Sequence, residues 1–189
     1  MDADNFGFNH ADLVAKDRDH MIHPWVDLGL VKSREPLIVV EGEGATVTDS
    51  RGHRMIDGIG GMWCVNVGYD RDEIADAIAE QARKLCYFSP FGMIATPPSI
   101  EFAHRLAKYA PGDLKHVFFT TGGSTAVDSA LRFVQFRNNF LGKPKKKHII
   151  TREYAYHGST LLSASVSGKP ADRAPSALPE LRHHLGGLR

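Results

Sequence analysis

The spacing of apolar positions in the first third of the chain is typical of short strands. Residues 37–41 and 45–49 are runs of β-branched and apolar residues separated by glycine. A turn at 49–52 leads into a third short run at 54–57. This alternation of short runs and turn residues predicts a small antiparallel meander.

Further along, apolar residues recur at helical spacing. In residues 70–85 this spacing includes Ile74 and Ile78, and Asp70 and Glu73 stand at the positions of a capping box. A second amphipathic stretch follows Thr96 and two prolines, which favour the first turn of a helix. Both segments are predicted to be helices with one apolar face.

The pattern changes to alternating strand and helix after residue 115. Residues 116–121 form an apolar run that predicts a buried strand, followed by a helix over 125–140 with Ser124 as its N-cap, and by another strand over 148–151. Strand, helix and strand at this spacing predict an α/β fold with a parallel sheet covered by helices.

The turn between the first of these strands and its helix is a candidate anion site. Gly123 lets the backbone turn tightly, the first helix amides lack intrahelical acceptors, and the hydroxyls of Ser124 and Thr125 add donors. An aromatic cluster around Tyr156 follows the next strand, and the carboxyl ends of parallel strands meet in one crevice. A phosphate site beside an aromatic ring indicates a planar, phosphorylated cofactor.

The same turn admits a hydrolase interpretation. Gly122, Ser124 and Ala126 nearly match the nucleophile elbow of α/β serine hydrolases, and His157 could serve as the base. The chain has no glycine-rich oxyanion segment after a preceding strand, which disfavours this alternative.

Composition excludes several classes of function. The chain has 189 residues with 23 Lys and Arg against 22 Asp and Glu, so it lacks the basic surplus of a nucleic-acid-binding protein. Its apolar runs are shorter than the roughly 20 residues that cross a membrane. With 2 cysteines and an acidic start, we expect a cytoplasmic protein without disulfides. No metal is expected, because no carboxylate or cysteine stands at ligand spacing from the histidine pairs His20/His23 and His183/His184.

Six motifs resemble those of the class III pyridoxal-phosphate-dependent aminotransferases, most of all the omega-amino acid:pyruvate type. They occur in the same order and at similar spacing from about residue 10 to residue 169. The motifs are His23–Trp25, Asp49–Gly52, Asp57–Tyr69, Gly123–Asp128, Gly142–Lys147 and Tyr156–Thr160.

The resemblance implies a fold type I transferase that binds pyridoxal 5'-phosphate (PLP). Such a protein has a small domain built partly from an N-terminal α+β segment, and a large domain with a mostly parallel sheet. The amides of Gly123 and Ser124 would hold the cofactor phosphate, Tyr156 would stack on the pyridine ring and His157 would lie beside it. The implied cofactor-binding residues are Gly123, Ser124, Thr125, Tyr156, His157 and Gly158.

The resemblance also implies a reaction and a partner. An amino group would pass from an amine or omega-amino acid to an oxo acid such as pyruvate. Trp25, Met62 and Trp63 would line the substrate pocket, and Phe91 would reach into the active site of the second subunit of a homodimer.

The chain also departs from the family pattern. Thr125 stands where the family usually has Glu, and residues 170–189 do not match. We predict an N-terminal segment and pocket wall over 1–68, the first part of the PLP-binding domain over 69–169, and a divergent tail over 170–189. No lysine has the context of the family's Schiff-base lysine, and no other catalytic residue is identified. We therefore expect a truncated chain that is inactive alone, and a non-catalytic dimerising or regulatory role is the alternative.

Overall fold

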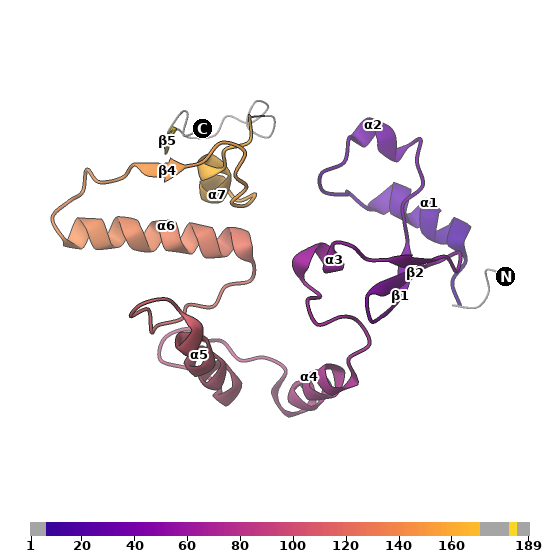
Figure 1. Ribbon diagram of the computed structural model, residues 1–189, viewed down its shortest axis with the longest axis horizontal. Coiled ribbons are helices and arrows are strands. Elements are labelled where there is room, and N and C mark those ends of the chain that lie inside the picture. The colour runs from indigo at the N-terminus through magenta and orange to yellow at the C-terminus, as the bar shows by residue number, and fades with distance from the viewer. Residues whose placement is uncertain (1–6, 171–181, 185–189) are drawn as a thin grey trace. The chain divides into compact units, whose positions relative to one another are not determined.

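The computed structural model describes residues 7–170 and, for the backbone, residues 182–184. The chain forms two compact units, residues 1–89 and residues 90–189 (Figure 1).

The first unit is built around a three-stranded antiparallel sheet in the order β1-β2-β3. Val47, in the central strand, pairs with Gly42 on one side and Met55 on the other, and its side chain is buried. The predicted meander is therefore confirmed. The elements of this unit are α1 (His10–His20), α2 (Leu28–Val31), β1 (Val39–Glu43), β2 (Thr46–Asp49), β3 (Arg54–Ile56), α3 (Gly60–Trp63) and α4 (Asp72–Leu85).

Helix α1 is attached to the turn that follows β2. Asn9 caps it, accepting a hydrogen bond from the amide of Asp12 at 3.1 Å. His10 Nδ1 lies 2.7 Å from Ser50 Oγ, and Val14 is buried. Arg51 Nε donates a second hydrogen bond to His10 Nε2 at 3.1 Å, so polar contacts of His10 and the buried Val14 hold the helix near the sheet.

Helix α4 confirms the predicted helix but not its predicted start. It begins at Asp72, and Asp70 has a left-handed backbone with φ of 57°. The side chain of Glu73 accepts a hydrogen bond from Arg71 Nε at 2.8 Å. The capping box is therefore wrong, because the ion pair with Arg71 occupies the carboxylate that the box requires.

The second unit combines helices with a parallel pair of strands. Its elements are α5 (Pro97–Tyr109), α6 (Gly123–Phe140), β4 (Ile149–Thr151), α7 (Leu161–Val166) and β5 (Arg182–His184). Helix α7 packs against both α6 and β4, and β5 runs parallel to β4 with Ile150 opposite His183. The α/β class is thus confirmed, but the parallel partner of β4 is β5 and not the strand predicted over 116–121. Residues 171–181 and 185–189 of the predicted tail lie outside the described residues.

The predicted buried strand over 116–121 is wrong. The segment has no regular secondary structure, and two neighbouring side chains contact different helices: Phe118 meets Phe133 of α6 edge to face at 5.3 Å, and Phe119 stacks on Phe102 of α5 at 5.6 Å. A strand also needs a neighbouring strand for its backbone hydrogen bonds. None of the strands in the described part of the chain pairs with it.

Few apolar side chains are buried. Within residues 7–170 these are Val14, Val47 and Val166. The apolar face of α4 is solvent-exposed, with Ile78 at 65%. The amphipathic patterns therefore predicted the helices correctly, while their apolar faces remain uncovered within the described structure.

Candidate functional site

The start of α6 is the centre of the candidate cofactor site. The helix begins at Gly123, and the extended residue Gly122 is its N-cap, accepting a hydrogen bond from the amide of Ala126 at 2.9 Å. The prediction of Ser124 as the cap is therefore wrong, because Ser124 lies inside the first turn. The amides of Gly123, Ser124 and Thr125 belong to that turn, where helix geometry provides no acceptor.

Two threonine hydroxyls stabilise the turn itself. Thr125 Oγ1 donates to the carbonyl oxygen of Gly122 at 2.8 Å, and Thr120 Oγ1 donates to the same oxygen at 3.1 Å. The hydroxyl proton of Thr125 is thus directed to the backbone. What Thr125 offers a ligand in this arrangement is its amide.

The loop after β4 lies directly against this first turn. The amide of Ser159 donates to Ser124 Oγ at 3.0 Å. Gly158 has φ of 135°, and a Cβ placed on it would come within 2.6 Å of Ser124 Oγ and would also meet Ser163 Oγ. Only glycine fits so close to the helix. Because Ser124 Oγ accepts from Ser159, its own proton stays available for a ligand oxygen.

His157 is held by hydrogen bonds at its ring and at its backbone. Its Nε2 lies 3.1 Å from Thr151 Oγ1 at the end of β4, and its amide donates to Ser167 Oγ at 3.0 Å. Ser167 is buried and donates in turn to the carbonyl oxygen of Ser163 at 2.9 Å. Within the described structure the hydrogen bonds of His157 and Ser124 go to different partners, which removes the Ser124–His157 pair that a serine hydrolase needs.

Asp128 joins the site although the sequence reasoning gave it no role. Its Oδ1 accepts a hydrogen bond from the amide of Ser163 in α7 at 2.8 Å, and Ser163 is fully buried. Asp128 follows Ser124 by four residues, so both lie on one face of α6. That spacing is the signal that could have identified it.

Tyr156 and Phe91 are both solvent-exposed in the second unit. Tyr156 directly precedes His157 and is 53% exposed, whereas Phe91 is 87% exposed. Hydrogen bonds through Ser167, Ser163 and Thr160 thus connect His157 to Ser124, and Gly158 lies in close steric contact with Ser124.

The three candidate substrate residues of the first unit share an unusual backbone. Trp25, Met62 and Trp63 have φ of 63°, 59° and 66°, and each side chain is more than half exposed. Side chains other than glycine rarely adopt this left-handed conformation, and such strain is concentrated at functional sites.

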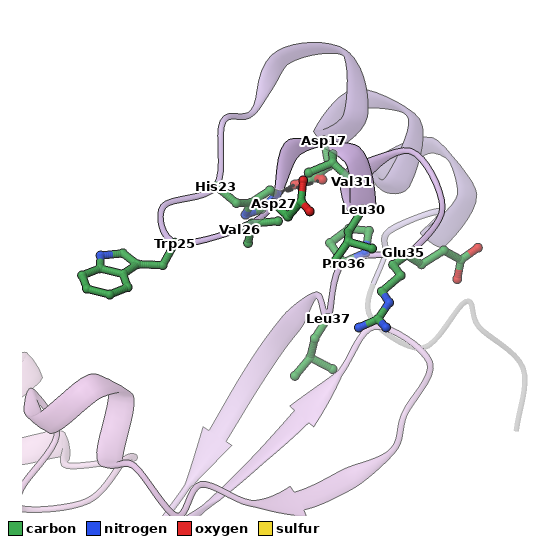
Figure 2. A pocket seen from close by; sticks show the side chains of 11 residues that line it. Asp17, His23, Trp25, Val26, Asp27, Leu30, Val31, Glu35, Pro36 and Leu37 are labelled. Carbon is green, nitrogen blue, oxygen red and sulfur yellow. Dashed lines mark hydrogen bonds and ion pairs between the residues drawn. The ribbon is translucent and has the colours of Figure 1, made fainter. Parts of the chain in front are cut away.

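A cavity of about 420 Å³ lies beside Trp25, between the segment after α1 and the start of β1 (Figure 2). Figure 2 shows the Trp25 indole extending away from the other lining side chains. Met62 and Trp63 do not line this cavity. Its lining residues are Asp17, His23, Trp25, Val26, Asp27, Leu30, Val31, Arg34, Glu35, Pro36 and Leu37.

At the wall of this cavity the structure corrects the expectation that no carboxylate supports His23. Its Nε2 lies 2.9 Å from Asp17 Oδ1, so a carboxylate does support this histidine, across six residues of sequence. Residues 7–170 contain no cluster of three or more His, Cys, Asp or Glu side chains able to hold a metal. The side chains of His183 and His184 lie outside the described residues.

No helix in the described ranges is both long enough and apolar enough to span a bilayer.

Residues 30–183 match the family model described as Aminotransferase class-III. A putrescine–pyruvate aminotransferase of Pseudomonas aeruginosa is 40% identical over 157 residues, which cover 83% of this chain and 34% of that protein. The uncharacterized aminotransferase y4uB of Sinorhizobium fredii is 40% identical over 177 residues, which cover 91% of this chain and 38% of that protein.

The fold of this chain is also similar to solved structures of transaminases. A thermostable (S)-enantioselective omega-transaminase from Thermomicrobium roseum superposes with a TM-score of 0.89 at 38% identity, covering 94% of this chain and 40% of that one. An omega-transaminase from Pseudomonas jessenii in complex with PMP gives a TM-score of 0.87 at 35% identity, covering 91% of this chain and 39% of the neighbour. The chain thus spans well under half the length of the relatives it matches.

Proposed function

Because the chain belongs to the class III aminotransferase family, whose members are fold type I enzymes that use PLP, we propose that its second unit binds the phosphate of PLP. We propose that the protein transfers an amino group from an amine or omega-amino acid to an oxo acid such as pyruvate. The names of the Pseudomonas aeruginosa and Thermomicrobium roseum relatives support this substrate class.

The observation that carries the proposal is the cradle at the start of α6. The amides of Gly123, Ser124 and Thr125 belong to the first helical turn, where the macrodipole favours an anion. The loop at Gly158 approaches so closely that a Cβ would collide with Ser124. A phosphate needs several converging donors, and this arrangement of amides and one hydroxyl fits it.

The chain's own residues would orient the cofactor. When bound, PLP supplies an electron-withdrawing ring that makes a proton on the amine's carbon removable. Tyr156 would provide a flat apolar face for that ring. His157, fixed by Thr151 and Ser167, would bound the site on one side and keep the loop closed over α6.

We also propose that Trp25, Met62 and Trp63 contact the amine, and that Phe91 contacts the second subunit of a homodimer. The exposed apolar faces of this chain support a covering partner, because apolar surface of this extent is costly in water. A cytoplasmic location is part of the same proposal.

Binding of PLP by the 189-residue chain tests the proposal. Ser124→Ala removes one hydroxyl donor to a charged phosphate and should weaken PLP binding about tenfold, since such a bond contributes about 1.5 kcal/mol and a tenfold change is about 1.4 kcal/mol. Ser129→Ala, the same change further along α6, should leave the affinity unchanged. Inorganic phosphate should compete with PLP. Equal affinities for the two variants would contradict the assignment.

Catalytic competence needs a separate measurement. We propose that this chain alone binds PLP without forming a covalent link to it. After borohydride treatment and denaturation, mass spectrometry should find the unmodified mass. A lysine carrying the reduced cofactor would overturn this part of the proposal.

A further inference from the structure

A left-handed turn places Met62 and Trp63 at the surface of the first unit. Four consecutive residues, Gly60 to Trp63, have φ between 54° and 66°. The amide of Trp63 donates to the carbonyl oxygen of Ile59 at 2.8 Å, and that of Cys64 donates to Gly60 at 3.0 Å. L-residues disfavour this hand, so the turn persists only if its surroundings hold it.

The carboxylate of Asp57 is what holds the turn. Its Oδ2 accepts a hydrogen bond from the amide of Gly61 at 2.6 Å and another from Tyr69 Oη at 2.7 Å. Its Oδ1 accepts from the amide of Ile59 at 3.2 Å. The hydrogen bond from Tyr69, followed by that from the Gly61 amide, lowers the pKa of Asp57 below its ordinary value. The group is therefore ionised near neutral pH, when it only accepts hydrogen bonds.

Tyr69 connects this carboxylate to the sheet. Its amide donates to the carbonyl oxygen of Gly44 at 2.8 Å, just beyond β1. Its ring lies against Gly42, where a Cβ would come within 2.5 Å of the ring. A Cβ on Gly68 would come within 2.9 Å of the Gly44 carbonyl oxygen. The sheet thus fixes Tyr69, Tyr69 fixes Asp57, and Asp57 fixes the turn.

We propose that Asp57 and Tyr69 are positioning residues that set the direction of Met62 and Trp63. This rests on the proposed function, in which these two exposed side chains contact the amine. The two residues act through the backbone of the turn, without touching the substrate. Through the turn, the carboxylate of Asp57 thereby sets the direction from which the Trp63 indole closes the proposed amine pocket.

The test uses the fluorescence and near-ultraviolet circular dichroism of Trp63. The chain has 2 tryptophans, so Trp25→Phe leaves Trp63 as the single reporter. In that background Asp57→Ala should abolish most of the Trp63 dichroism and lower its fluorescence anisotropy. Tyr69→Phe should cause a smaller loss. Asp57→Asn keeps an acceptor oxygen and should retain more signal than Asp57→Ala.

Glu43→Gln is the matched control. Glu43 accepts a hydrogen bond from Arg54 at 2.7 Å within the same sheet and does not contact the turn, so this variant should keep the full Trp63 signal. If Asp57→Ala loses the far-ultraviolet signal of the sheet, that variant has unfolded. Tyr69→Phe then tests the proposal, because it removes a single oxygen. Unchanged Trp63 signals in Tyr69→Phe and in a folded Asp57→Ala would overturn the proposal. This readout needs no cofactor, so its failure is distinguishable from a failure of PLP binding in the second unit.

Discussion

Replacing Gly158 by alanine tests the close contact on which the cofactor site depends. The added Cβ would lie 2.6 Å from Ser124 Oγ and 2.8 Å from Ser124 Cα, and would also meet Ser163 Oγ. Real Cβ atoms do not tolerate such distances, so the loop must move away from α6. That movement would break the hydrogen bond from the Ser159 amide to Ser124.

Two costs combine in this variant. Placing a residue with a side chain at φ of 135° costs about 1–3 kcal/mol. Forcing an extra methyl group into a packed position costs about 1–3 kcal/mol. Gly158→Ala should therefore lower the free energy of unfolding by about 2–6 kcal/mol.

Gly142→Ala provides the control for backbone strain. Gly142 also has a positive φ, 68°, but a Cβ there would have no atom within 4 Å. It should lower the free energy of unfolding by about 1–2 kcal/mol through backbone strain alone. Urea titration of the 189-residue chain, followed by circular dichroism, compares the two variants. A difference below about 0.5 kcal/mol would refute the close approach, because the collision is what separates them.

Three further predictions concern other parts of the molecule. Asp128→Ala should lower the free energy of unfolding by about 1–3 kcal/mol in urea titration, because it leaves the amide of the buried Ser163 without its acceptor. Because the pKa of Asp57 is lowered in the folded protein, its contribution to stability is complete above its ordinary pKa of 3.8 and is lost as the pH falls through the lowered pKa. Asp57→Asn should therefore flatten the acid dependence of the unfolding midpoint below pH 3.8. Phe91→Arg should weaken any homodimer in sedimentation velocity, because it places a charge on an exposed apolar residue at the proposed interface; an unchanged dimer would place the interface elsewhere.

Local sequence patterns were sufficient for elements stabilised by neighbouring residues. The meander over residues 39–56 follows from short β-branched runs separated by turns, and helix α5 from apolar spacing behind two prolines. Both depend on contacts close in sequence. The strand predicted over 116–121 depends on a partner strand, and an apolar run carries no information about whether such a partner is present.

The cofactor site was predictable in its residues but not in its connections. Glycine and hydroxyl residues before a helix indicated an anion site, and the aromatic cluster indicated a ring. The contact between Ser159 and Ser124 spans 35 residues, so no local pattern predicts it. For the same reason the carboxylate of Asp128 was overlooked, although its spacing from Ser124 places both on one face of α6.

The left-handed turn at Met62 and Trp63 was not predictable from residue preferences. Neither residue favours positive φ, and the turn forms because Asp57 accepts hydrogen bonds from Gly61 and Tyr69. Tertiary contacts thus override local preference at a position that the family resemblance assigns to the substrate. This conflict between local preference and structure is itself an indication of function.

The proposed cofactor site depends on the first amides of α6 holding the phosphate of PLP. This contact can be measured through the amide chemical shifts of the ¹⁵N-labelled 189-residue chain, recorded while PLP is added. We expect saturable shifts at Gly123, Ser124 and Thr125, reproduced by inorganic phosphate and lost in Gly158→Ala. Shifts that saturate elsewhere while these three amides stay unchanged would contradict it.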